Sequence, residues 1–205
     1  MELACLDLEG VLVPEIWIAF AERTGIEELR ATTRDIPDYD VLMKQRLGLL
    51  DQHNLKINDI QEVIATLSPL PGAIDFVDWL RERFQVIILS DTFYEFSEPL
   101  MRQLKWPTLF CHRLVPDETG RVVDYKLRQK DPKRASVQAL HSLNYRVIAA
   151  GDSYNDTSML GEADVGFLIH APQNVIEEFP QFKSVDSLEE LKLAFLGASE
   201  RDLSL

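Results

Sequence analysis

Acidic and hydroxyl side chains directly follow three short apolar runs of the sequence. Asp7 and Glu9 follow the first run, Ser90 and Asp91 follow the second, and Asp152 follows the third. If these runs are parallel strands, the side chains meet at one edge of a sheet, because ligands of open parallel sheets bind beyond the carboxyl ends of the strands. Carboxylates that cluster beside a hydroxyl are suited to hold a hard cation and a phosphate group. The spacing therefore predicts a site for phosphoryl transfer.

Asp7 is the predicted nucleophile of that site. A carboxylate that attacks phosphorus forms an acyl phosphate, which divides one difficult displacement into two easier ones. Glu9 lies two residues further on, where an extended segment points its side chain the same way, so we expect it to act as general acid and then as general base. Attack by one anion on another requires charge screening, which Mg²⁺ bound by Asp7 and Asp152 would supply. The Ser90 hydroxyl would donate a hydrogen bond to the phosphoryl oxygens.

Strands that alternate with helices must position these groups. Continuously apolar runs are typical of buried parallel strands, and the sequence has four, which are Leu3–Leu6, Val86–Leu89, Val147–Ala150 and Val165–Ile169. Helical stretches are predicted at 73–83, 94–104, 132–143 and 157–163, and a hairpin at 112–125. This alternation predicts an α/β protein with a Rossmann-like, doubly wound parallel sheet.

A helical block interrupts the alternation after the first strand. Apolar residues recur at helical spacing in 15–24, in 26–31, in a stretch opened by Pro37 and Asp38, and in 60–67. The break Ser68–Gly72 ends the block. We therefore expect a catalytic core of residues 1–13 and 72–205, with a small helical cap of residues 14–71 inserted after the first strand.

The chain is acidic, and this restricts its partners. It has 205 residues, 46% of them hydrophobic, and a formal net charge of −13. A strongly acidic chain repels phosphate backbones, so we expect no nucleic-acid partner, and an anionic substrate requires a locally basic pocket. The first residues lack the features of a signal peptide, and no apolar run approaches the roughly 18 residues of a membrane span, so we expect a cytoplasmic protein with no membrane partner. A homodimer is compatible with the sequence, but no face identifies an interface.

Four segments in this order resemble the motifs of the haloacid dehalogenase superfamily of phosphatases. Residues 7–12, Asp-Leu-Glu-Gly-Val-Leu, resemble motif I, and Ser90 at the end of an apolar strand resembles motif II. Lys133, ahead of another apolar strand, resembles the lysine of motif III, and residues 151–156 resemble motif IV. The resemblance implies an aspartyl-phosphate on Asp7 and Mg²⁺ held by Asp7, Asp152 and the backbone carbonyl of Glu9. It also implies that Ser90, Lys133 and Asn155 hold the phosphoryl group.

The helical insertion resembles the small cap of phosphoserine phosphatases. That resemblance implies that Glu15 pairs with the substrate ammonium group and that Arg46 holds its carboxylate, for which a guanidinium is well suited. The whole sequence resembles bacterial bifunctional phosphoserine phosphatase/homoserine phosphotransferases, which also carry glutamate at the position of Glu9. The implied function is Mg²⁺-dependent phosphoserine hydrolysis with homoserine as a second acceptor, and the implied partners are these small molecules.

Several assignments stay open in the sequence. Three basic residues compete for the role of the motif III lysine, namely Lys130, Lys133 and Arg134. Asp91 either contacts substrate or supports the site, Asn155 contacts phosphate or caps a helix, and Asp156 holds the lysine or tunes the metal site. A phosphatase for another small phosphomonoester and a phospho-receiver signalling module are the alternative functions. The four histidines lack ligand spacing and are interpreted as structural, namely His53, His112, His141 and His170.

Overall fold

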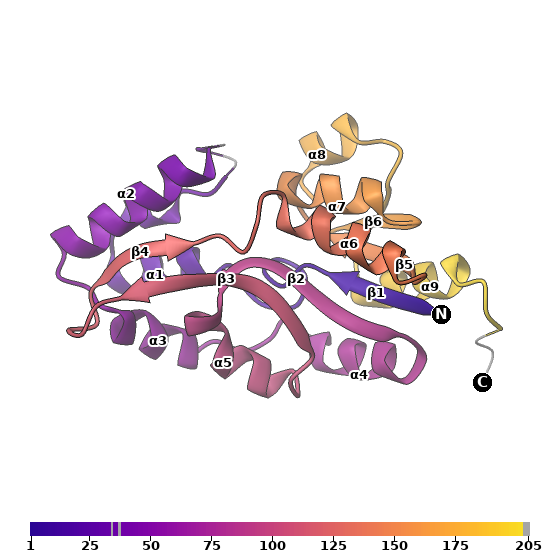
Figure 1. Cartoon of the computed structure of the whole chain (residues 1–205), viewed down its shortest axis with the longest axis horizontal. Coiled ribbons are helices and arrows are strands. Elements are labelled where there is room, and N and C mark those ends of the chain that lie inside the picture. Colours follow the sequence, from indigo (N-terminus) through magenta and orange to yellow (C-terminus); the bar gives the residue numbers. More distant parts are fainter. Residues whose placement is uncertain (34, 37, 203–205) are drawn as a thin grey trace.

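The described residues form a seven-stranded sheet in the computed structural model, which describes residues 1–33, 35–36 and 38–202 (Figure 1). The strand order is β4-β3-β2-β1-β5-β6-β7, and every neighbouring pair is parallel except β3 and β4. The strands are β1 (Glu2–Leu6), β2 (Gln85–Phe93), β3 (Thr108–Pro116), β4 (Val122–Lys126), β5 (Arg146–Gly151), β6 (Val165–Ile169) and β7 (Lys183–Val185). This order confirms the predicted doubly wound α/β class, with β1 between β2 and β5.

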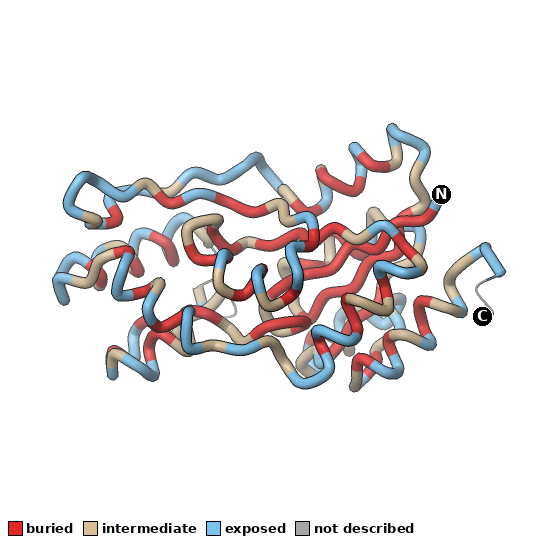
Figure 2. The backbone as a smooth tube through the Cα atoms, turned by 90° about the horizontal axis from the view of Figure 1, so that it is seen from below, coloured by how far each residue is buried: buried red, intermediate tan, exposed pale blue. Residues whose placement is uncertain are grey.

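Helices cover both faces of the sheet. They are α4 (Ala73–Arg83), α5 (Tyr94–Gln103), α6 (Pro132–Ser142), α7 (Thr157–Glu162), α8 (Gln173–Glu178) and α9 (Leu188–Ala198). Strand side chains alternate between the faces, so Leu3 and Cys5 pack with α6, α7 and α8, whereas Ala4 and Leu6 pack with α4, α5 and α9. The central strands are accordingly almost continuously buried (Figure 2).

Three α-helices and a 3₁₀ helix lie between β1 and α4 in the described part of the chain, and we call them the inserted helices. They are α1 (Ile16–Thr24), the 3₁₀ helix η1 (Glu27–Arg30), α2 (Tyr39–Gln52) and α3 (Ile57–Ala65). The Asp38 side chain caps α2, since it accepts the N–H groups of Asp40 and Val41 at 2.9 and 3.2 Å. Pro37, the other residue predicted to open this helix, lies outside the described residues.

The hairpin of β3 and β4 supports the inserted helices from one side. Arg121 Nε lies 2.5 Å from Asp51 Oδ1 of α2, and the Ile57 N–H of α3 donates to the Gly120 carbonyl at 2.9 Å. The Tyr125 hydroxyl of β4 also donates to Asp40 of α2. Figure 1 shows α2 lying beside β4. The inserted helices are thereby connected to an edge of the sheet.

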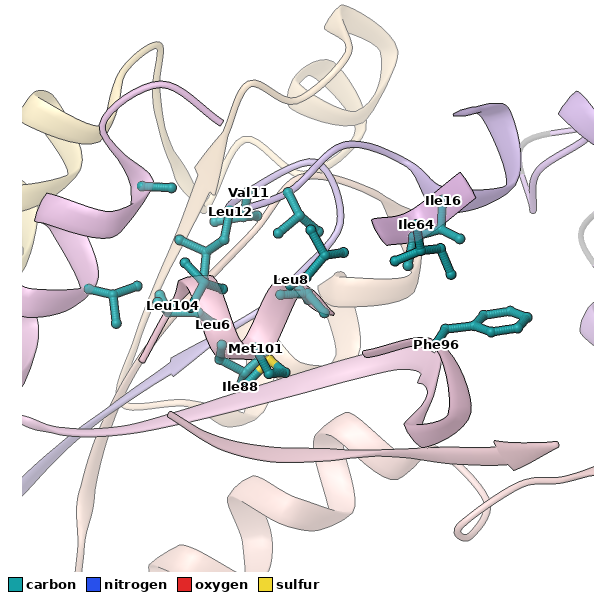
Figure 3. Packing of buried hydrophobic residues seen from close by; sticks show 14 of the residues in the cluster. Leu6, Leu8, Val11, Leu12, Ile16, Ile64, Ile88, Phe96, Met101 and Leu104 are labelled. Carbon is teal, nitrogen blue, oxygen red and sulfur yellow. The ribbon is translucent and has the colours of Figure 1, made fainter. Parts of the chain in front are cut away.

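Apolar side chains fix the loop between β1 and α1. Leu8, Val11 and Leu12 are fully buried, and they pack with residues of β2 and α5 (Figure 3). The N–H groups of Leu12 and Val13 both donate to the Leu8 carbonyl, at 2.8 and 3.0 Å. The loop that follows Asp7 is therefore held by packing and by its own hydrogen bonds.

The predicted elements match the structure in most places and differ in several; the helix predicted at 60–67, for example, is α3 at Ile57–Ala65. The α-helix expected at 26–31 is the short 3₁₀ helix η1, of which only Leu29 is buried. The second strand continues to Phe93, so Ser90 and Asp91 lie within it rather than after it. The segment from α8 to α9, including β7, was not predicted in detail. None of the described helices combines the length and apolar character that crossing a membrane requires.

Candidate active site

The carboxyl ends of β1, β2 and β5 meet at one edge of the sheet. The Asp7 N–H donates to the Ala150 carbonyl at 3.0 Å, which continues the pairing of β1 with β5 by one residue. Asp152 directly follows β5, and Ser90 lies in the last half of β2. Asp7, Ser90 and Asp152 are buried, and all three line one cavity. The structure thus brings together the three segments that the apolar runs predicted.

Lys133 lies at the centre of the buried charges of this site. It is the second residue of α6, after Pro132, and it is only 2% exposed. Its Nζ lies 2.9 Å from Asp7 Oδ1, 2.7 Å from Asp156 Oδ1 and 3.5 Å from Asp91 Oδ2. One ammonium group therefore connects the predicted nucleophile with two other carboxylates.

The two competing basic residues lie outside this cluster. Lys130 is exposed, and Arg134 Nε pairs with Glu162 Oε2 at 2.7 Å on the surface. Of the three candidates, Lys133 is the residue that contacts Asp7.

Burial and neighbouring charges together raise the pKa values of both Lys133 and Asp7. Burial opposes the charge of Lys133, but the carboxylates of Asp156, Asp7 and Asp91 outweigh it and raise the pKa of Lys133 well above its ordinary value. Burial, followed by the carboxylate of Asp156, raises the pKa of Asp7, which Lys133 opposes. The cluster therefore keeps its lysine charged and holds more negative charge than that lysine can balance.

Asp156 holds the cluster in place through hydrogen bonds to Lys133 and to the backbone after β5. Its Oδ1 accepts a hydrogen bond from Lys133, and its Oδ2 accepts the N–H groups of Asp152 and Ser153 at 3.0 and 3.2 Å. Gly151 permits this approach, because a Cβ at that position would lie 2.3 Å from Asp156 Cγ. Asp156 therefore positions both Lys133 and the backbone that carries Asp152.

The acidic residues of the cluster fit a divalent cation. Asp7, Asp152 and Asp156 offer carboxylate oxygens that all lie within 4.8 Å of one another, and such oxygens are the ligands that Mg²⁺ prefers. Asp156 already bonds Lys133 and two N–H groups, so Asp7 and Asp152 are the better candidates for side-chain ligands. Gly10, at φ +79°, brings the loop close to this group, since a Cβ there would lie 2.5 Å from Asp152 Oδ2.

Asp91 and Asn155 pair with each other at the wall of the cavity. The Asn155 Nδ2 donates to Asp91 Oδ2 at 2.7 Å, and His112 Nε2 lies 3.3 Å from Asp91 Oδ1. Burial alone would raise the pKa of Asp91, but Lys133 and then His112 and Asn155 lower it well below its ordinary value. Asp91 and Asn155 therefore line the cavity as a hydrogen-bonded pair, and the Asn155 side chain does not cap the following helix.

Glu9 lines the same cavity as Asp7, and its carboxylate is bound to the first residue of α1. Its Oε2 accepts the Ile16 N–H at 2.8 Å. Burial, followed by the nearby Glu15 carboxylate, raises the pKa of Glu9 to about 7, although the Ile16 N–H, Arg46 and Thr92 lower it. A carboxyl group with such a pKa can both give and accept a proton near neutral pH.

Arg46 provides a basic group on the wall of the cavity. Its guanidinium lies 4.5 Å from the centre of the Trp17 ring, and its NH2 donates to the Ala31 carbonyl at 2.9 Å. Arg46 is only 7% exposed, and its Nε has no hydrogen-bond partner among the described residues. Glu15 lines the same cavity, and its side chain forms no capping hydrogen bond with α1 as described. A carboxylate that precedes α1 and a guanidinium on α2 thus line the same cavity.

Sequence reasoning missed several residues of the site, and His112 and Thr92 are two of them. His112 was interpreted as structural, yet its Nδ1 accepts the Arg128 N–H at 3.1 Å while its Nε2 faces Asp91, so it connects the wall of the cavity with the segment after β4. A single histidine in a strand carries no spacing signal that could reveal this contact. Thr92 also lines the cavity, and its position two residues after Ser90 was the available signal.

The doubly wound sheet, the inserted helices and the buried Asp–Lys cluster together define a class of hydrolase. The family model of the haloacid dehalogenase-like hydrolases matches residues 1–164. The chain therefore belongs to the haloacid dehalogenase-like hydrolase family, as its four motifs predicted.

Individual relatives narrow the comparison. The chain is 75% identical to "Phosphoserine phosphatase ThrH" of Pseudomonas aeruginosa, over 100% of both chains. It is also 75% identical to a "Phosphoserine phosphatase" of Pseudomonas syringae pv. tomato, over 100% of this chain and 86% of that protein. Among solved structures, one described as a phospho-aspartyl intermediate analogue of phosphoserine phosphatase is similar, with a TM-score of 0.76 and 19% sequence identity. The match covers 94% of this chain and 98% of that chain, and it supports the fold.

Proposed function

We propose that this protein is an Mg²⁺-dependent phosphoserine phosphatase that works through an aspartyl-phosphate on Asp7 and also transfers the phosphoryl group to homoserine. The observation that carries the proposal is the contact of 2.9 Å between Lys133 Nζ and Asp7 Oδ1, in a site whose cavity is also lined by Arg46 and Glu15. The names of the relatives that are 75% identical support the choice of substrate.

The reaction would proceed in two displacements at one phosphorus atom. In the first, an Asp7 carboxylate oxygen attacks phosphorus, the bond to the serine oxygen breaks, and Glu9 protonates that leaving oxygen. In the second, Glu9 removes a proton from the acceptor, whose oxygen attacks phosphorus while the bond to Asp7 breaks. Water as acceptor yields inorganic phosphate, and homoserine yields phosphohomoserine. Both outcomes regenerate Asp7 and Glu9.

Three side chains would bind the phosphoryl group. Ser90 and Lys133 would donate hydrogen bonds to its oxygens, and Asn155 would do so from the wall that it forms with Asp91. The side chains of Asp7 and Asp152, with the backbone carbonyl of Glu9, would hold Mg²⁺. When bound, Mg²⁺ would screen the negative charge between the carboxylates and the phosphoryl group.

Residues of the inserted helices would select the amino acid. Arg46, buried and with its Nε unpartnered among the described residues, would bind the substrate carboxylate. Glu15 would pair with the substrate ammonium group. We therefore propose that residues 14–71 act as a cap for substrate selection and that residues 1–13 and 72–205 form the catalytic core.

A competition assay tests this proposal. The purified protein is given phosphoserine and Mg²⁺, with and without homoserine, and free phosphate and phosphohomoserine are both measured. We expect phosphate alone without homoserine and both products with it. No product from phosphoserine would refute the substrate, and phosphate without any phosphohomoserine would refute the second activity.

A further inference from the structure

The Thr92 hydroxyl is a buried polar group on the wall of the cavity, and it forms no hydrogen bond of ordinary geometry with the described residues. Thr92 lies in β2, is only 3% exposed, and lines the cavity together with Asp7 and Glu9. Its Oγ1 has no hydrogen-bond partner among the described residues. Buried hydroxyl groups nearly always have a partner, because leaving one unpaired costs free energy. An unpaired hydroxyl on the wall of a cavity therefore indicates a ligand atom as its partner.

Thr92 is also a neighbour of the proposed acid/base residue. One oxygen of Glu9, Oε2, is held by the Ile16 N–H at 2.8 Å. The Thr92 side chain interacts with that carboxyl group as a hydrogen-bond donor and helps to lower the pKa of Glu9, but the two groups are not within ordinary hydrogen-bond geometry. An oxygen atom placed between the two groups would give a proton to one and accept a hydrogen bond from the other.

We propose that the Thr92 hydroxyl binds the acceptor oxygen of the second displacement and favours water over homoserine as that acceptor. This inference rests on the proposed function. In the step concerned, the acceptor O–H gives its proton to Glu9 and accepts a hydrogen bond from Thr92. The acceptor oxygen bonds to phosphorus, and the bond between phosphorus and Asp7 breaks.

The preference for water follows from how each acceptor is held. Homoserine would be anchored at its carboxylate by Arg46 and at its ammonium group by Glu15, which places its hydroxyl independently of Thr92. Water has no such anchors, and its position depends on the groups that hydrogen-bond to it. Removal of the Thr92 hydroxyl should therefore slow hydrolysis more than transfer.

The test is the ratio of phosphohomoserine to free phosphate formed from phosphoserine at a fixed homoserine concentration. Thr92→Val has nearly the same shape without the hydroxyl, and Thr92→Ala is a second hydroxyl-free variant. Because one neutral hydrogen bond is lost, we expect the ratio to rise about three- to tenfold in both. Thr92→Ser, which keeps the hydroxyl, should return the ratio toward the wild-type value.

Ser184→Ala is the matched control. Ser184 Oγ is likewise buried without a partner among the described residues, but it lies in β7 and is not among the residues that line the cavity. Its ratio should equal that of the wild type. An unchanged ratio in Thr92→Val and Thr92→Ala, with the wild type forming both products, would overturn this inference alone. A wild type that forms neither product would overturn the proposed function instead.

Discussion

At the scale of residues, the site depends on a balance between buried carboxylates and one buried lysine. Four carboxylates share this region, those of Asp7, Asp91, Asp152 and Asp156, and Lys133 contacts three of them. A buried ion pair is weak evidence for stability, but removal of one partner leaves uncompensated charge and is strongly destabilising. Lys133 should therefore support both the fold and the chemistry.

Replacement of Lys133 by Met tests this balance. We expect Lys133→Met to lower the free energy of unfolding by roughly 3–5 kcal/mol, because the carboxylates lose their counter-charge. Mg²⁺ should recover part of the loss if it binds as proposed, since it would then stabilise the folded state. The measurement is urea unfolding with and without Mg²⁺. Lys130→Met is the control, because Lys130 is exposed, and it should change stability by at most about 0.5 kcal/mol. Equal effects of the two substitutions would contradict the role of Lys133.

Replacement of Arg46 by Ala tests substrate selection. Loss of a hydrogen-bonded charge pair with the substrate carboxylate should raise KM for phosphoserine about 10- to 100-fold. Phosphoethanolamine lacks that carboxylate, so its KM should change little. Lys44→Ala, an exposed change on the same helix, is the control. If activity toward phosphoserine were indifferent to Arg46→Ala, the result would contradict the role of Arg46 and support the alternative of a phosphatase for another phosphomonoester.

Residue types and their order were enough to predict which groups meet, but not how they pair. Asp7, Ser90 and Asp152 could be placed because each is at or near the end of an apolar strand, and parallel strands end at a common edge. The contacts of Asp91 with His112 and Asn155 could not be predicted, because they join residues from three separate segments. Such contacts depend on side-chain packing, which has no periodic signal.

At the scale of elements, close approach of the backbone positions the charged cluster. The end of β5 passes so near Asp156 that a Cβ at Gly151 would lie 2.3 Å from Asp156 Cγ. Helix α2, in contrast, has room at Gly48, where a Cβ would meet nothing within 4 Å. The same substitution should therefore have opposite effects at the two glycines.

Gly151→Ala and Gly48→Ala form a matched pair of tests. Gly151→Ala should displace Asp156, and with it Lys133, and lower the free energy of unfolding by roughly 1–3 kcal/mol or more, as overpacking does. Gly48→Ala should raise it by roughly 0.5–1 kcal/mol, because alanine is the better helix former. Thermal unfolding of both variants measures these changes. A Gly151→Ala protein as stable as the wild type would contradict the packing described for Asp156.

Elements with strong periodicity or continuous apolar character could be predicted from the sequence. The bounds of α4 and β6 agree with the prediction to the residue. The segment 26–31 is too short and too charged for periodicity to separate a 3₁₀ turn from an α-helix. The short β7 has three residues, and its place at the sheet edge is set by pairing with β6, which the sequence does not reveal.

At the scale of the whole molecule, Glu2 joins the two ends of the described chain. Its carboxylate accepts the Ser199 hydroxyl at 2.6 Å, the Glu200 N–H at 2.8 Å and Arg201 Nε at 2.8 Å. Burial alone would raise the pKa of Glu2, but these hydrogen bonds together lower it below its ordinary value. A lowered pKa means that the folded state binds the proton less tightly than the unfolded state does.

The stability that Glu2 contributes should therefore depend on pH. It is fully present above the ordinary glutamate pKa of 4.5 and is lost as the pH falls through the lower value of the folded state. Near pH 7, Glu2→Gln should lower the free energy of unfolding by about 1–3 kcal/mol. The difference from the wild type should shrink in acid, as urea unfolding at several pH values would show. Glu189→Gln, on the surface, is the control. A difference that grew in acid would contradict this account.

The molecule is acidic overall, whereas its candidate site needs local positive charge to bind an anionic substrate. The chain carries a formal net charge of −13, so an anionic substrate requires local positive groups. Lys133 and Arg46 provide them, and both are buried at or beside one cavity between the sheet edge and the inserted helices. The acidic composition indicated that the site needs local positive groups, and the fold shows that Lys133 and Arg46 are the basic residues buried there.

The most direct test of the central claim is the position of the phosphoryl group on the protein during turnover. The protein is mixed with phosphoserine and Mg²⁺, quenched in acid, digested and examined by mass spectrometry, with Asp7→Asn treated in parallel. We expect a phosphoryl group on Asp7 in the wild type, and neither phosphorylation nor turnover in Asp7→Asn. A phosphoryl group on another residue, or hydrolysis of phosphoserine by Asp7→Asn at the wild-type rate, would contradict the account.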